Sequence, residues 1–255
     1  MLNHLESKNI LEKKIEIDQI PGILFTPKEA ENPIPTIILY HGWSSNKEMQ
    51  RIRGFIFAAL GYQTFIPDAL YHGERNPLDN YHKENIPKYL WDVIFQSMDE
   101  SSIVIDELVS KYNADLERIG VTGHSMGGFT AAGVFTHNPQ LKTLAVLNGS
   151  CAWSNSNEIF KESLFQDINA YEIEYKVDIM DPMNNLQLLK DRPIILLHGQ
   201  SDDVVSIKSQ ELFYQEAQPI YRHKNRLRII KYLNLGHFVT TGMLEDNIIW
   251  FKKHL

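Results

Sequence analysis

A serine inside a glycine-rich hexapeptide is the best candidate for a nucleophile in this 255-residue chain. Residues 123–128 read Gly-His-Ser-Met-Gly-Gly, which places Ser125 at the centre of a Gly-x-Ser-x-Gly pattern. The apolar stretch 118–122 before it predicts a buried strand, and residues 126–138 predict a helix. Between a strand and a helix this pattern forms a tight turn, and the glycines are required because the two elements nearly touch. We therefore predict Ser125 as a nucleophile; a glycine-rich helix start that only packs on a strand is the alternative.

A serine at its ordinary pKa is a weak nucleophile, so it needs a base, and the base needs a carboxylate to orient it. The predicted strand 193–197 runs into His-Gly-Gln-Ser-Asp-Asp, and the predicted strand 228–233 runs into Asn-Leu-Gly-His. In parallel sheets with helices on both faces, sites form where strands end. Among the 10 histidines only His237 lies in the loop directly after the last predicted strand, so we predict it as the general base. Asp202 is the predicted acid, with Asp203 as its rival or as the cap of the next helix.

Acyl transfer also needs hydrogen-bond donors for the oxygen of the tetrahedral intermediate. One predicted donor is the backbone N–H of Met126, directly after the nucleophile. The other is the backbone N–H of Trp43, which follows His41 and Gly42 at the end of the predicted strand 36–40. An ordinary turn at the end of this strand is the alternative reading.

Short apolar segments alternate with helical patterns along the chain, which predicts an α/β fold with a mostly parallel central sheet flanked by helices. The predicted strands, including an N-terminal hairpin, are 14–18, 22–25, 36–40, 63–67, 118–122, 143–147, 193–197 and 228–233. The predicted helices are 46–60, 87–112, 126–138, 206–217 and 244–253. We expect a single domain over 1–255.

Residues 150–192 interrupt the alternation with a polar and aromatic segment that ends in a helical pattern at 182–190. An insertion of this length between strands commonly forms a cap over a site, so a short cap-like insertion is expected here. A surface excursion without a role is the alternative.

Composition limits the classes of partner. The formal net charge of -7 argues against a nucleic-acid partner, since affinity for nucleic acid comes from lysines and arginines that neutralise phosphates. The N-terminus lacks the apolar core of about 7 to 15 residues found in signal peptides, and no stretch approaches the roughly 18 apolar residues of a membrane span. The single cysteine, Cys151, cannot form an internal disulfide. We expect a cytoplasmic protein without stable membrane insertion. The sequon at Asn148 is more simply read as a turn.

The ordered motifs HGWSSNKE, PDALYHGER, GVTGHSMGG, MDPMNNLQLLKDRPIILLHGQSDDVV and NLGHF resemble the prolyl-oligopeptidase-related branch of the α/β-hydrolase superfamily. More narrowly, nearly the whole chain is similar to small bacterial esterases of the YitV type. The resemblance implies an α/β-hydrolase fold, a catalytic triad of Ser125, Asp202 and His237, and oxyanion-hole residues Trp43 and Met126. It also implies that the loop 68–75 lies beside the site. There Tyr71 and His72 could contact substrate, or the loop could be solvated with Arg75 in a salt bridge. Ser206 departs from the proline that the family often carries there.

The expected function is a serine hydrolase, a carboxylesterase acting on small or medium acyl esters. A peptidase that releases acylamino acids and a thioesterase are alternatives, and a ligand-binding homologue without turnover is a third. We expect no metal and no organic cofactor, because the chain lacks HExxH, GxGxxG and GxxxxGK[ST]. The bulky Trp43, Trp153 and Phe238 are expected near the pocket mouth, where they would limit acyl size, although core packing would explain large aromatic residues equally well.

Overall fold

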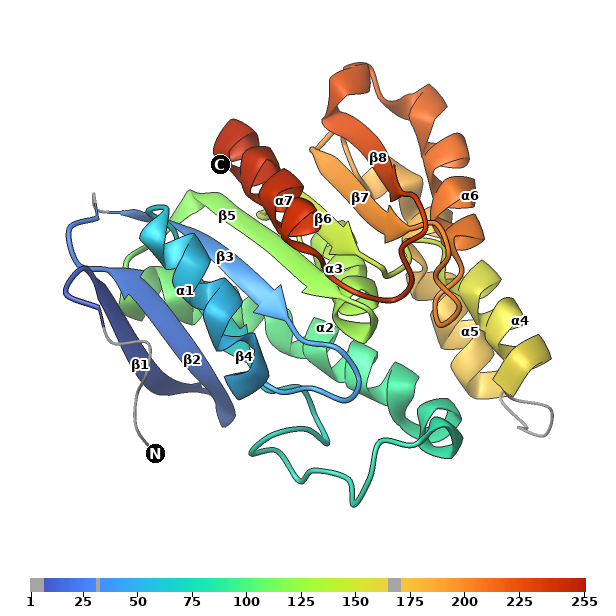
Figure 1. Cartoon of the computed structure of the whole chain (residues 1–255), viewed down its shortest axis with the longest axis horizontal. Coiled ribbons are helices and arrows are strands. Elements are labelled where there is room, and N and C mark those ends of the chain that lie inside the picture. Colours follow the sequence, from blue (N-terminus) through green and yellow to red (C-terminus); the bar gives the residue numbers. More distant parts are fainter. Residues whose placement is uncertain (1–6, 31–32, 165–170) are drawn as a thin grey trace.

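The computed structural model describes residues 7–30, 33–164 and 171–255 (Figure 1). The strands are β1 (Ile10–Ile17), β2 (Ile20–Pro27), β3 (Ile34–Tyr40), β4 (Gln63–Pro67), β5 (Ala114–His124), β6 (Thr143–Leu147), β7 (Ile194–Gly199) and β8 (Leu227–Tyr232). The helices are α1 (Arg51–Ala59), α2 (Ile86–Tyr112), α3 (Met126–His137), α4 (Trp153–Leu164), α5 (Tyr171–Met180), α6 (Ile207–Ala217) and α7 (Thr241–His254). A short 3-10 helix, η3 (Pro182–Leu188), precedes β7.

All eight strands form one sheet in the order β1-β2-β4-β3-β5-β6-β7-β8. The strands β1 and β2 form the predicted antiparallel hairpin, and β2 also runs antiparallel to β4. Every other neighbouring pair is parallel, from β4 through β3 to β8. The prediction of a mostly parallel sheet is therefore confirmed.

Helices cover both faces of the sheet, because alternate residues of the buried strands point to opposite sides. In β3, Ile37 and Leu39 pack on the face covered by α1 and α7, where Phe57 and Phe251 lie. Ile38 and Tyr40 pack on the other face, in a core that also contains residues of α2, α3 and α6. Figure 1 shows α1 and α7 on one side of the sheet and α2 on the other. Near-continuous apolar strands are therefore explained by burial on both faces.

The segment of residues 150–192 contains α4, α5 and η3, and residues 165–170 within it lie outside the described part of the chain. The helical pattern predicted at 182–190 is a 3-10 helix that ends at Leu188. It begins at Pro182 because the side chain of Asp181 accepts a hydrogen bond from the N–H of Met183 and caps the first turn. A cap role for the segment stays a prediction.

Candidate active site

The turn between β5 and α3 holds Ser125 in a strained backbone conformation. Its φ of 57° and ψ of -126° are values that a residue with a side chain rarely adopts. A Cβ on Gly123 would lie 2.0 Å from the carbonyl oxygen of Gly127, and a Cβ on Gly127 would lie 2.2 Å from that of Tyr40. Both glycines are therefore required by the close approach of strand and helix, and the turn projects Ser125 at the carboxyl edge of the sheet.

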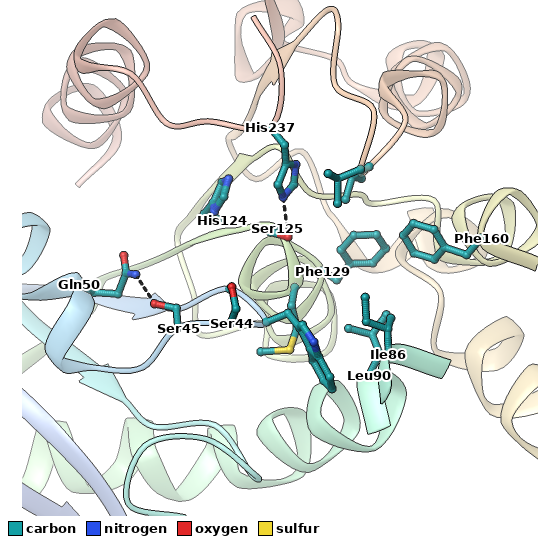
Figure 2. Close-up of a pocket in the computed structure, with 15 residues that line it drawn as sticks. Ser44, Ser45, Gln50, Ile86, Leu90, His124, Ser125, Phe129, Phe160 and His237 are labelled. Atoms are coloured by element: carbon teal, nitrogen blue, oxygen red, sulfur yellow. Dashed lines mark hydrogen bonds between the residues drawn. The ribbon is translucent and has the colours of Figure 1, made fainter. Parts of the chain in front are cut away.

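Three side chains from three different strand ends meet at this edge. The hydroxyl of Ser125 donates a hydrogen bond of 2.8 Å to Nε2 of His237 (Figure 2). Nδ1 of the same ring donates one of 2.8 Å to Oδ2 of Asp202. The imidazole thus accepts a hydrogen bond from the serine at one nitrogen while the carboxylate fixes the tautomer at the other, which is the geometry that activates a serine.

The carboxylate of Asp202 is buried and held on several sides. Its Oδ1 accepts hydrogen bonds of 2.9 Å from the N–H groups of Val204 and Val205. Burial raises the pKa of Asp202, but hydrogen bonds from His198, His237 and the Val205 N–H outweigh it and lower the pKa well below its usual range. The carboxylate is therefore ionised wherever the imidazole can serve as a base.

The neighbouring acid has no part in this arrangement. Asp203 is exposed, and the helix that follows is capped by Ser206, whose side chain accepts a hydrogen bond from the N–H of Lys208. The suggestion that Asp203 caps α6 is therefore wrong. Sequence reasoning also missed His198, a fully buried residue at the end of β7 whose Nε2 lies 3.4 Å from Asp202 Oδ2.

Asn148 fastens the loop that carries His237. Its Nδ2 donates to the carbonyl oxygen of Phe238 at 3.0 Å, and its Oδ1 accepts from the N–H of Gly199 at 2.9 Å. One amide therefore joins the ends of β6 and β7 to the histidine loop. The residue is fully buried and has a φ of 44°, which agrees with the turn predicted at this position. Sequence reasoning missed this role of the side chain. The only signal for it was the position of Asn148 directly after a buried strand.

The two predicted oxyanion donors line the same pocket as Ser125. Met126 is the first residue of α3, so its N–H has no carbonyl partner within the helix. Trp43 follows β3, and within the described ranges neither of these two N–H groups donates a hydrogen bond to another residue. Both donors are therefore available to an oxygen bound beside Ser125.

A buried polar network holds the loop that contains Trp43. His72 hydrogen-bonds the carbonyl oxygen of Trp43, and Nε2 of His41 accepts a hydrogen bond of 3.0 Å from the N–H of Ala69. Burial, then the neighbouring His72, lowers the pKa of His41 to about 4, so the ring is neutral near pH 7. Lys47 forms an ion pair with Asp68, and both side chains are almost fully buried.

The loop 68–75 packs behind the site instead of entering it. Tyr71 and His72 are not among the residues that line the pocket, and His72 is fully buried. Arg75 forms an ion pair with Glu100, as in the salt-bridge reading of this loop. The backbone of the loop is held by Asp68, whose carboxylate accepts hydrogen bonds of 2.9 Å from the N–H groups of Lys47 and Glu74.

The pocket at Ser125 has a volume of about 410 Å³. Of the three bulky residues expected at its mouth only Trp43 lines it. Trp153 is fully buried against Trp91 and Phe95, as the core-packing alternative predicts, and Phe238, which is 71% exposed, does not line the pocket. Sequence reasoning missed the apolar residues that line the pocket from α2, α3 and α4; they are Ile86, Leu90, Phe129 and Phe160.

Two negative observations apply to the described residues alone. Within the ranges given above, no group of three or more histidine, cysteine, aspartate or glutamate side chains could hold a metal ion. No helix in that same part of the chain is long and apolar enough to cross a bilayer.

Comparison with known proteins gives a family and several relatives. The model of the prolyl oligopeptidase family matches residues 95–255. The putative esterase YitV of Bacillus subtilis is 28% identical over 95% of this chain and 99% of its own length. The esterase YjfP of Escherichia coli is 27% identical over 94% of this chain and 97% of its own length.

Solved structures agree on the fold. The crystal structure of TT1662 from Thermus thermophilus superposes with a TM-score of 0.77 at 17% identity, covering 96% of this chain and 97% of that one. Identity at this level supports the shared fold alone.

Proposed function

This chain belongs to the prolyl oligopeptidase family, and from that premise we propose that it is a serine hydrolase that cleaves small- or medium-chain carboxylic esters through an acyl-enzyme on Ser125. The observation that carries the proposal is the unbroken hydrogen-bond path from Ser125 through His237 to Asp202 at the wall of a pocket. The likeness to two proteins named as esterases over almost their full length supports esters as the substrate class.

Acylation begins when Nε2 of His237 takes the hydroxyl proton of Ser125 while Oγ attacks the ester carbonyl carbon. The carbonyl π electrons move to the oxygen, which receives hydrogen bonds from the N–H groups of Trp43 and Met126. The intermediate then collapses, the bond to the alcohol oxygen breaks, and His237 returns the proton to that oxygen. Asp202 stabilises the imidazolium throughout and stays ionised.

Deacylation repeats these steps with water in place of serine. His237 takes a proton from the water as its oxygen attacks the acyl carbon, the bond to Ser125 Oγ breaks, and the proton passes to the serine. The products are a carboxylic acid and the free enzyme. His237 is the group of this chain that takes and returns the proton in both halves of the reaction.

The test is hydrolysis of p-nitrophenyl esters of increasing acyl length, with acyl-CoA thioesters and aminoacyl anilides as competing classes. We expect the esters to give the highest kcat/KM, and Ser125→Ala to lower kcat by roughly six orders of magnitude. A fluorophosphonate probe should label the natural chain and Ser110→Ala, a variant of an exposed helix serine far from the pocket, but not Ser125→Ala. Activity that survives in Ser125→Ala, or a preference for anilides, contradicts the proposal.

A further inference from the structure

The pocket at Ser125 has two walls of opposite chemistry (Figure 2). On one side of the serine lie Phe129, Phe160, Ile86 and Leu90, all apolar. On the other side lie the polar residues Ser44, Ser45, Gln50 and His124. Ser44 is exposed, so the polar wall continues to solvent. A carbonyl carbon placed at Ser125 would therefore have an apolar surface on one flank and a hydrogen-bonding surface on the other.

The polar wall contains buried atoms that lack a hydrogen-bond partner. Gln50 is only 9% exposed, and its Nε2 donates a bond of 2.7 Å to Oγ of Ser45. In the described part of the chain, Oε1 of Gln50 and Nε2 of His124 are among the buried side-chain atoms that have no hydrogen-bond partner, and both residues line this pocket. Burial, then the charges of His237 and Arg53, lowers the pKa of His124 to about 3, so its ring is neutral near pH 7. Buried polar groups are nearly always paired, so two unpaired ones in a pocket wall point to a ligand that pairs them.

The order of the reaction decides which half of an ester meets this wall. Water attacks the acyl-enzyme from the place that the alcohol oxygen has left, because acylation and deacylation pass through equivalent transition states in opposite directions. That flank must admit water in every turnover, and water is held where two or more polar partners surround it. The polar wall meets this condition, so the alcohol half of the ester lies against the polar wall and the acyl chain lies against the apolar wall.

Building on the proposed function, we propose that Gln50 is a specificity residue that binds hydroxyl groups of the alcohol half, so that the preferred substrates are aliphatic esters of polyols. The hydroxyl groups of a polyol both donate and accept, so one can pair Oε1 of Gln50 and another the free imidazole nitrogen of His124. A simple alkyl alcohol in the same place leaves both unpaired, which costs binding in the transition state.

Glycerol monobutyrate and propyl butyrate test this proposal, since they share the acyl group and a three-carbon alcohol and differ by two hydroxyls. Each kcat/KM is divided by the rate constant of alkaline hydrolysis of the same ester, which removes the difference in intrinsic reactivity. We expect the corrected ratio to favour the glycerol ester by about tenfold, the effect of one well-made hydrogen bond at the upper end of its range. Gln50→Leu, which keeps the volume and removes the amide, should bring the ratio close to one.

Leu90→Ala is the matched control from the apolar wall. It should change kcat/KM for both esters alike and leave the corrected ratio as in the natural chain, because the two esters carry the same acyl group. Labelling by the fluorophosphonate probe verifies that each variant is folded. A ratio near one in the natural chain, or a ratio that Gln50→Leu does not alter, overturns the inference while ester hydrolysis itself stands. If neither ester is hydrolysed, the proposed function is overturned as well.

Discussion

The two sides of Ser125 are held in place by different kinds of interaction. On the oxyanion side, residues 41–47 and 68–75 are joined by buried histidines and by the buried ion pair of Lys47 and Asp68. On the acid-base side, residues 199–205 and 233–239 are joined by hydrogen bonds from backbone groups and from the neutral amide of Asn148. Leu233 and Phe238, which flank His237 on its loop, are 77% and 71% exposed.

The difference corresponds to what each side has to do in the proposed reaction. Oxyanion donors act best when they are fixed before the reaction, since they then need no reorganisation as charge develops. A base must instead accept and return a proton twice in each turnover, so its surroundings must tolerate both the neutral and the charged ring. A buried charged network suits the first task, and a carboxylate beside a partly exposed ring suits the second. The two sides should therefore fail in different ways.

The largest effect is expected from a change of charge on the acid-base side. Asp202→Asn retains the size of the side chain but offers an amide where His237 needs a carboxylate, so the imidazole adopts the wrong tautomer and loses stabilisation of its charged form. We expect kcat/KM for p-nitrophenyl butyrate to fall by about 10⁴.

Asp203→Asn is the control for this variant, because it makes the same chemical change one residue further along, at an exposed position. Its kcat/KM should stay within about twofold of the natural value, since surface substitutions away from a site rarely matter. Equal losses of kcat/KM in the two variants would contradict the assignment of Asp202 as the residue that orients His237. The proposed difference between the two sides would then have no support.

The next effect concerns the stability of the oxyanion side. Lys47→Met leaves the carboxylate of Asp68 buried without its cation, with only backbone N–H groups to compensate it. Removing one partner of a buried ion pair costs about 3–5 kcal/mol in the free energy of unfolding. Urea unfolding followed by circular dichroism should report this loss as a lower midpoint.

Lys14→Met provides the comparison, because Lys14 is 64% exposed in its ion pair with Glu48. An exposed pair is worth at most about 1 kcal/mol, so this midpoint should hardly move. If Lys47→Met were as stable as Lys14→Met, the buried network would not be what fixes the oxyanion loop.

Two features could be predicted because they depend on local patterns: the positions of the strands, and the meeting of Ser125, His237 and Asp202 at one sheet edge. A buried parallel strand is a continuous apolar run, and the ends of such strands share an edge, so residues that follow them come together whatever lies between. The strand pattern placed the boundaries of β4 and β6 at the residues where the structure has them. Asp202 could be preferred over Asp203 only by position, which is what the structure now resolves by distance.

The pocket walls could not be predicted, because they depend on which of many similar residues face a cavity. Trp153 and Phe160 lie on the same helix, yet the first is buried in the core and the second lines the pocket. Gln50 lay inside a predicted helix, where a glutamine gives no sign of facing a site. Asn148 looked like a turn because its main-chain conformation is that of a turn; the two hydrogen bonds of its side chain are tertiary contacts.

The smallest effect is expected at His124, where the two sides meet. Its ring lies 4.8 Å from that of His237, and its Nδ1 would lie 3.7 Å from a Cβ placed on Gly42 of the oxyanion loop. Burial, followed by the charges of His237 and Arg53, lowers the pKa of His124 from 6.5 to about 3 in the folded chain. Between these two values the unfolded chain binds the proton and the folded chain does not, so the free energy of unfolding falls as the pH falls below about 6.5.

For His124 alone this loss should amount to about 1 kcal/mol between pH 7 and pH 5.5, a window set by its lowered pKa. Other buried histidines with a lowered pKa, such as His41, also lower the free energy of unfolding on acidification. The contribution of His124 is therefore measured as the difference between the natural chain and a His124 variant. Urea midpoints of the natural chain and of His124→Gln, measured at both pH values, provide it. The natural chain should lose more stability on acidification than the variant. Equal losses would mean that His124 is protonated as readily in the folded chain as in the unfolded one, and that water reaches the boundary between the two sides freely.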